Sequence, residues 1–375
     1  MKQYYILPVI GLLILSCSQA QQSELPEFFV DTNQDSSLPL SEIEAEITAI
    51  ELELTNESLI NPDVIRRVII TENNIILFEL NLISSSKVFV FNKEGEFIRT
   101  IGSKGQGPGE YNIIQNVAFD EKSKRFFIVT LFPTKIICYH LDGKFLKESR
   151  LNHVDYRDIN YINDELFLEC TSIEGKLAKR ILYRMNENLQ ITDSIICWEN
   201  YYERNYHGMS YFWDYIVKIK SSIYVYLSEA YPKWNAPNVK VLRDTLYRLE
   251  DNKLVPELKL KFKNDGFDGL GDKIIDLYNI FRSSRYIFAI YQINPNNRTN
   301  QHEKTYRYHF CYDTKTGKGY NMLDGYTDDI NGIEKRVSIH PLHTDSEIFY
   351  YWHTNMKPDD REEPNPTLYI IKLKK

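Results

Sequence analysis

The chain has 375 residues, enough for two average domains or for one large β-architecture. Its 45 Lys and Arg residues against 52 Asp and Glu residues give a formal net charge of −7, which argues against a nucleic-acid-binding surface. The 27 Tyr and 19 Phe residues contrast with only eight Ala. Because aromatic residues favour strands whereas alanine favours helices, this composition indicates a β-rich protein.

Residues 1–17, MKQYYILPVIGLLILSC, have the layout of a bacterial secretory signal. Lys2 precedes an apolar run that is shorter than the roughly 20 residues needed to span a bilayer. The ending ILSC is similar to a lipobox, which makes Cys17 the expected lipidated N-terminus. An ordinary cleaved signal or an unprocessed anchor are the alternatives. Gln19 after this cysteine is compatible with outer-membrane sorting, and the periplasmic and surface faces both stay open.

Residues 18–42 are rich in Ser, Gln, Asp and Pro, a composition that predicts a flexible tether. Phe28, Phe29 and Val30 interrupt this composition and are candidates to dock on the folded body, which we expect to comprise residues 43–375. No other stretch approaches 18 consecutive apolar residues, so the membrane is reached through the lipid anchor only.

Four further cysteines lie within apolar, strand-like runs, and none has the spacing of metal ligands. Such positions favour buried free thiols, although an exported protein could also form disulfides. These cysteines are Cys138, Cys170, Cys197 and Cys311.

A hairpin pattern recurs along the body. Lys87–Thr100 and Lys135–Glu148 each contain a basic residue, a strand, a short link, a glycine and a second strand. Gly95 and Gly143 would supply the positive φ of the hairpin turn, a role that Asn can also fill. The pattern returns in Arg180–Asp193, Asp244–Glu257 and His309–Met322, with Asn188, Asn252 and Gly317 at the turns, and a sixth copy begins at Thr367.

Each repeat also holds two earlier strand candidates, such as Ile113–Asp120 and Arg125–Val129. Four strands every ~40–50 residues, with insertions, are typical of propeller blades, so the sequence predicts an all-β, six-bladed β-propeller. The sixth repeat ends before its outer strand. We expect Ile47–Leu54 to supply that strand and to close the ring, which removes exposed sheet edges. A two-domain sandwich, the alternative, would not explain six similar hairpins.

The chain also resembles the six-bladed β-propeller lipoproteins of Bacteroides-type bacteria, which are related to NHL-repeat propellers. The resemblance covers nearly the whole chain after the signal, and GQGPGEY at 105–111 is its most specific motif. It implies a propeller fold and an envelope location, but no settled activity. Three shorter matches support it: DTLYRL at 244–249, DDING at 328–332 and NPTLYIIKLK at 365–374.

The motif GQGPGEY raises the question of an anion-binding loop, because backbone N–H groups of Gly-rich loops can hold phosphates. It lacks the Lys-Ser/Thr pair and the helix that follow such a loop. A tight connection between two blades is the favoured interpretation, with Glu110 and Tyr111 near the channel entrance.

Aromatic and polar residues gather in two segments of the long fourth repeat. Side chains of this kind combine ring stacking with hydrogen bonding, as binding sites for sugars or peptides do. The alternative is ordinary packing of outer strands. With Glu110 and Tyr111, the candidate ligand-binding residues are Tyr202, Arg204, Tyr206, His207, Trp213 and Trp234.

Potential metal ligands are densest between His340 and His353, but alternate strand residues point to opposite faces and all of them come from one repeat. Neither Thr327–Gly332 nor Asn264–Asp272 fits a calcium loop, and no catalytic triad motif is present. We therefore expect no metal site and no cofactor, and catalytic residues stay unassigned.

Together these observations favour a binding or scaffold protein over an enzyme. The expected ligand is a glycan, a peptide or an envelope protein held at one mouth of the ring, by a monomer or a member of an envelope complex. The alternative is a metal-dependent lyase or lactonase that uses the central channel.

Overall fold

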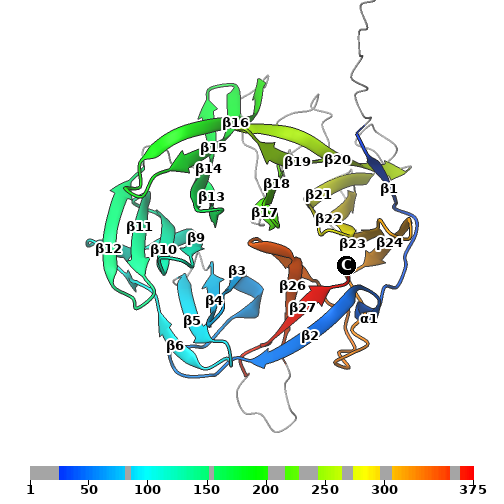
Figure 1. The fold of residues 1–375 in the computed structure, drawn as a ribbon, viewed down its shortest axis with the longest axis horizontal. Helices are drawn as coiled ribbons and strands as arrows, with labels where there is room; N and C mark the ends of the chain where they lie inside the picture. The colour runs from blue at the N-terminus through cyan, green and yellow to red at the C-terminus, as the bar shows by residue number, and fades with distance from the viewer. Residues whose placement is uncertain are drawn as a thin grey trace, which may run out of the picture.

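The computed structural model describes residues 25–80, 86–151, 156–201, 216–227, 244–263, 273–295, 306–354 and 364–375. Six antiparallel sheets stand around a common axis (Figure 1), which confirms the six-bladed β-propeller. Helical structure in these ranges is limited to α1 (Leu40–Ile43) and the 3-10 turn η1 (Pro62–Val64).

We number the blades in chain order and give their strands from the axis outward. Blade 1 comprises β3 (Ile65–Ile70), β4 (Asn74–Glu79), β5 (Lys87–Asn92) and β6 (Phe97–Thr100). Blade 2 comprises β9 (Ile113–Asp120), β10 (Arg125–Leu131), β11 (Lys135–His140) and β12 (Phe145–Arg150). Blade 3 comprises β13 (Tyr156–Ile162), β14 (Glu165–Glu174), β15 (Leu177–Met185) and β16 (Ile191–Tyr201).

The other three blades follow the same order. Blade 4 comprises β17 (Ile216–Ile219), β18 (Ser222–Tyr226), β19 (Thr245–Glu250) and β20 (Lys253–Lys263), with β1 (Glu27–Asp31) added outside β20. Blade 5 comprises β21 (Lys273–Arg282), β22 (Tyr286–Pro295), β23 (Tyr306–Asp313) and β24 (Lys318–Leu323). Blade 6 comprises β25 (His340–Leu342), β26 (Asp345–His353), β27 (Thr367–Leu373) and β2 (Glu44–Glu51).

The N-terminal strand β2 closes the ring, as the sequence predicts, although it spans Glu44–Glu51 and so begins and ends three residues before the expected Ile47–Leu54. It pairs antiparallel with β27, from Glu44 opposite Leu373 to Glu51 opposite Thr367. The first and last strands of the ring therefore share one blade, and the sheet of blade 6 gains the outer strand that its own repeat lacks.

The segment before β2, residues 27–43, is bound to the outside of three blades. We call this segment the strap. Strand β1 pairs in parallel with β20, and Val30 is fully buried. On blade 5, the Ser36 amide donates to the Asn321 carbonyl over 2.7 Å, and the Asn321 amide donates to Ser36 Oγ over 2.8 Å. The docking expected for Phe28–Val30 is therefore present, and the part of the expected tether from Glu27 onward is paired with the body.

The core lies between neighbouring blades. All six residues of β4 are buried, and β10 and β11 are apolar runs, because both faces of these middle strands are covered by other blades. Val90 of blade 1 and Phe126 of blade 2, for example, belong to one apolar cluster. The outer strand β16 is instead mostly exposed, as expected at the circumference.

The two ends of the ring differ in their connections. In blade 1, Ile65 at the start of β3 pairs with Glu79 at the end of β4, which pairs with Lys87 at the start of β5. Connections between blades and loops between second and third strands therefore open at one end, which we call the loop mouth. Turns between first and second strands, and between third and fourth strands, lie at the other end, which we call the turn mouth.

Hairpin turns at the turn mouth follow the predicted pattern, with one correction. Gly95, Gly143, Asn252 and Gly317 have positive φ as expected. In blade 3 the residue with positive φ is Leu189 (φ 60°), not Asn188. Asn186 Oδ1 accepts hydrogen bonds from the amides of residues 188 and 190, which shifts the turn by one residue.

Candidate functional site

Buried polar groups occupy the axis of the ring. Arg67 of β3 is fully buried, and its Nη1 donates to the Val117 carbonyl in blade 2 and to the Ile159 carbonyl in blade 3. Its Nη2 lies 2.7 Å from Asp158 Oδ1. The Asp158 carboxylate also accepts from Asn116 and Asn160 at 2.8 and 2.9 Å. One arginine thus joins the innermost strands of blades 1, 2 and 3.

The turn between β25 and β26, with the first residues of β26, also forms hydrogen bonds to the inner strands of two other blades. The Lys218 amide of blade 4 donates to the His343 carbonyl over 2.9 Å, and Ser346 Oγ donates to the Arg282 carbonyl of blade 5 over 2.6 Å. His343 is itself buried, and desolvation together with the nearby Arg67 guanidinium lowers its pKa well below the ordinary value. Blades 4, 5 and 6 are therefore also joined at the axis.

A metal-dependent lyase or lactonase, the alternative raised by the sequence, would need metal ligands in the central channel. Among the described residues, no three His, Cys, Asp or Glu side chains form a group that could hold a metal ion. His340 stacks on Trp352 with ring centroids 5.7 Å apart, whereas His343 lies buried next to the axis. At the axis the Asp158 carboxylate is bonded to Arg67 and to two asparagines, whereas Nδ1 of the buried His343 has no hydrogen-bond partner in the described part of the chain.

Exposed apolar side chains mark the loop mouth. Six exposed apolar residues belong to outer strands, and two of them, Phe145 and Ile191, are the first residues of β12 and β16 and therefore lie at the turn mouth. The exposed apolar residues on connections or strand ends of the loop mouth are Leu54, Leu59, Phe132, Ile173, Tyr201, Tyr306 and Ile330.

Phe132 is the most exposed large apolar residue in the described loops between second and third strands, and hydrogen bonds hold the backbone of its turn. It is 68% exposed in the loop between β10 and β11 and has a φ of 54°, a conformation that costs energy for a bulky residue. Its carbonyl accepts a hydrogen bond of 2.7 Å from Asn112 Nδ2, and Thr130 Oγ1 donates to the carbonyl of Pro133 over 2.9 Å. Sequence reasoning missed Phe132, although a lone aromatic before a proline between two strands is a usable signal.

The GQGPGEY connection joins the outer strand β6 of blade 1 to the inner strand β9 of blade 2. It contains β7 (Ser103–Lys104) paired in parallel with β8 (Glu110–Tyr111). Its amides are used by the protein itself: Gly107 donates to the Glu110 carboxylate over 2.8 Å, and Gly109 donates to Glu148 over 3.0 Å. The arrangement is that of an inter-blade connection and leaves no amide cradle for a phosphate at these positions.

Glu110 and Tyr111 have structural contacts in this connection. Tyr111 is buried in the cluster between blades 1 and 2, and its hydroxyl donates to the Ile101 carbonyl over 3.1 Å. Burial raises the pKa of Tyr111 to about 12. Burial also raises the pKa of Glu148, but hydrogen bonds from Lys135 and Gly109 outweigh that effect and hold it below the ordinary value.

The other candidate ligand-binding residues lie outside the described residues, as does Cys17. The strand ends that flank their segments, at the end of β16 and β18 and at the start of β17 and β19, belong to the loop mouth. The residues concerned are Tyr202, Arg204, Tyr206, His207, Trp213 and Trp234.

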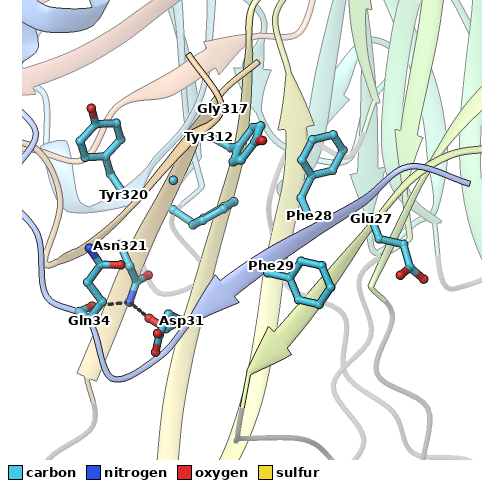
Figure 2. A pocket seen from close by; sticks show the side chains of 11 residues that line it. Glu27, Phe28, Phe29, Asp31, Gln34, Tyr312, Gly317, Tyr320 and Asn321 are labelled. Carbon is cyan, nitrogen blue, oxygen red and sulfur yellow. Dashed lines mark hydrogen bonds between the residues drawn. The ribbon is translucent and has the colours of Figure 1, made fainter. Parts of the chain in front are cut away.

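A second candidate site is a cleft on the circumference, between β1 of blade 4 and β23 and β24 of blade 5. Figure 2 shows the side chains that line it, among them Phe28, Tyr312 and Tyr320. Its volume is about 270 Å³. The rings of Phe28 and Tyr312 meet edge to face with centroids 4.9 Å apart, so they form one continuous aromatic wall. We call this site the rim cleft.

The described cysteines are free thiols, and Cys138, Cys170 and Cys311 are buried as expected. Burial raises the pKa of Cys197, the least buried of the four, to about 12. A thiol with such a pKa is protonated at neutral pH and therefore weakly nucleophilic. Among the described residues, no helix is long and apolar enough to cross a membrane.

Comparison with solved structures shows a similar fold in two proteins from Bacteroides species. A Bacteroides fragilis protein described as exported is 18% identical, with 93% of this chain and 99% of that chain covered and a TM-score of 0.59. A member of the DUF4221 family from Bacteroides vulgatus is 9% identical, with 88% and 97% covered and a TM-score of 0.50. At these identities the likeness is one of fold.

No curated protein matches the sequence. Residues 26–373 match the family described as a domain of unknown function, DUF4934, from the first residues of the strap to the last strand of blade 6. The chain therefore belongs to the DUF4934 family.

Proposed function

We propose that this protein is a binding module of the bacterial envelope, held by a lipid at Cys17, which docks a partner protein on its loop mouth. The observation that carries the proposal is the difference between the two mouths. Among the described residues, seven large apolar side chains are exposed at the loop mouth, whereas the opposite mouth exposes two, Phe145 and Ile191, at the first residues of β12 and β16. Exposed apolar surface gathered at one place is typical of sites for protein association.

Phe132 is suited to act as an anchor in such an interface. Aromatic side chains that enter a pocket of the partner contribute a large share of binding energy. The Asn112 and Thr130 hydrogen bonds hold the Phe132 turn before binding, so little conformational entropy is lost on association. Ile173 and Ile330, on other connections of the same mouth, extend the apolar surface to blade 3 and to the junction of blades 5 and 6.

The N-terminal sequence supports the envelope location. A signal-like stretch ends at Cys17, and Gln19 is compatible with sorting to the outer membrane. The Bacteroides fragilis relative with the same fold is described as exported, which agrees with this address.

The channel lyase or lactonase is the less favoured function. It needs inward His and acidic side chains from at least three blades, free to hold a metal and a substrate. Around the axis, the described side chain of Asp158 is instead bonded to Arg67 and to two asparagines.

Site-specific photocrosslinking in living cells tests the proposal. A photoreactive amino acid at position 173 or 330, on the loop mouth, should give one crosslinked partner identifiable by mass spectrometry. The same amino acid at position 122 or 188, on the turn mouth, should give none. Phe132→Ser should reduce the crosslink, whereas Ile196→Ser, which changes an exposed side chain on the circumference, should not. Equal crosslinking from both mouths would contradict the proposal.

A further inference from the structure

We propose that the rim cleft binds one ring of an uncharged saccharide. This site is separate from the loop mouth: it lies on the circumference, where the strap passes from blade 4 to blade 5 (Figure 2). Its volume of about 270 Å³ is below the roughly 300–1,000 Å³ of pockets for drug-sized ligands, and therefore suits a single sugar ring rather than a folded segment of protein.

A glycine in the wall of the cleft points to a ligand. Gly319 lies within β24 and has an ordinary backbone conformation, so the turn chemistry that requires glycine elsewhere does not apply here. Glycine inside a strand weakens the sheet and often marks a position where a ligand approaches closely. A Cβ atom at this position would lie 3.3 Å from Phe310 and 3.5 Å from Tyr312. The absent side chain thus leaves the aromatic wall uncovered.

The polar groups of the rim cleft match the hydroxyl groups of a sugar. Among the described residues that line the cleft, the side-chain amide of Gln34 and the hydroxyls of Tyr312 and Tyr320 form no hydrogen bond with the protein. An amide and a phenol can each donate and accept, as sugar hydroxyls do. Aromatic faces beside such groups provide stacking for the apolar face of the ring.

The charges select against acidic saccharides. Two carboxylates, Glu27 and Asp31, line the rim cleft, whereas no described residue that lines it is Lys, Arg or His. Both carboxylates are ion-paired: Lys261 Nζ lies 2.5 Å from Glu27 Oε2, and Lys263 Nζ lies 3.5 Å from Asp31 Oδ2. The lining therefore offers no cation to pair with a sulfated or uronic sugar, which leaves a neutral ring as the expected ligand.

The test starts with the processed chain on an array of neutral, amino and acidic glycans, followed by calorimetric titration with the best neutral saccharide. Tyr320→Ala should weaken that affinity about tenfold, since it removes a ring and a hydroxyl. Gly319→Val should abolish binding by filling the cleft. Tyr312→Phe, which removes one hydroxyl and keeps the packing, should weaken binding several-fold. Ile98→Ala, at an exposed position of the outer strand β6 in blade 1, is the control and should leave the affinity unchanged.

Several outcomes would overturn the proposal. They are the absence of any neutral saccharide ligand at millimolar concentration, a preference for acidic glycans or for peptides, and binding that Gly319→Val and Tyr320→Ala leave intact. The partner crosslink at position 173 should persist in Tyr320→Ala and be reduced in Phe132→Ser. Failure of the saccharide site can therefore be told apart from failure of the loop-mouth interface.

Discussion

Arg67 and Asp158 form a buried ion pair across a whole blade: Nη2 lies 2.7 Å from Oδ1, although the residues belong to the inner strands of blades 1 and 3. Asp158 is 2% exposed and Arg67 is fully buried. Blade 2, which lies between them, contributes the Val117 carbonyl and the Asn116 amide to the same network. The pair therefore connects three blades that otherwise meet only their neighbours.

Removing one partner of this pair should destabilise the ring. Arg67→Met leaves Asp158 buried without its cation, and the expected loss in the free energy of unfolding is about 3–5 kcal/mol. Asp158→Asn, which leaves Arg67 without its anion, should cost a similar amount. Urea denaturation measures both, and a double-mutant cycle should show strong coupling. Additive effects would mean that the two side chains contribute independently.

The contact between the blade 1 hairpin and the closing strand offers a matched pair of glycine substitutions. Gly95 (φ 92°) and Gly143 (φ 89°) occupy equivalent turns. A Cβ at Gly95 would lie 2.1 Å from the Glu51 carbonyl oxygen at the end of β2, whereas at Gly143 the nearest atoms are 3.9 Å away. Backbone strain is common to both alanine variants, so Gly95→Ala should cost about 1–3 kcal/mol more than Gly143→Ala. Equal losses in urea denaturation would show that the turn does not press on β2.

Asn365 holds the connection that enters blade 1. Its Oδ1 accepts from the Ile60 amide over 2.9 Å, and its Nδ2 donates to the carbonyls of Glu53 and Ser58 over 2.8 and 2.7 Å. Asn365→Leu keeps the volume but leaves these groups without a partner, at an expected cost of about 1–3 kcal/mol in thermal or urea unfolding. Asn33→Leu, at an exposed asparagine, is the control and should change stability by less than about 0.5 kcal/mol.

Two buried histidines predict loss of stability in mild acid. Desolvation, assisted by the neighbouring His340 and Arg307, lowers the pKa of His309 to about 3, and desolvation with Arg67 lowers that of His343 well below 6.5. The unfolded chain, with histidine pKa values of about 6.5, binds protons that the folded chain excludes. The free energy of unfolding therefore includes the full contribution of these neutral histidines above about pH 6.5, and it falls as the pH decreases toward 3.

Urea denaturation between pH 7 and pH 4 measures this dependence. His309→Gln removes one titrating group and should reduce the slope by up to about 1.4 kcal/mol per pH unit. An unchanged slope would mean that His309 is protonated equally in the folded and unfolded chains.

The propeller could be predicted from the sequence because successive blades repeat the same residue types at their hairpin turns. Turn residues such as Gly95, Gly143 and Gly317 are required by backbone conformation, and they recur at the blade spacing. The blade 3 turn was misplaced by one residue because Leu189, a buried leucine, takes the positive φ. Asn186 makes the same hydrogen bonds as Asn92 in blade 1, and in both turns the positive φ falls three residues after the asparagine, so the position of the asparagine indicates the turn.

The candidate sites were harder to predict because they join residues that are distant in the sequence. The rim cleft combines Phe28 of the strap with Tyr312 and Tyr320, nearly 300 positions later. Arg67 looks like any arginine in an apolar strand until three inner strands converge on it. Composition placed aromatic binding residues in the fourth repeat, and the strand ends show only that those segments start and finish at the loop mouth.

The strap also determines how a mechanical load enters the molecule. Any pull from the N-terminal side meets β1 first, and then the bonds of Ser36 to Asn321 and of Ser41 to Asp329. The ring-closing strand β2 comes only after these attachments have given way. The strap can therefore be peeled from blades 4 and 5 while the ring remains closed. The bonds of the strap break first and protect the pairing of β2 with β27.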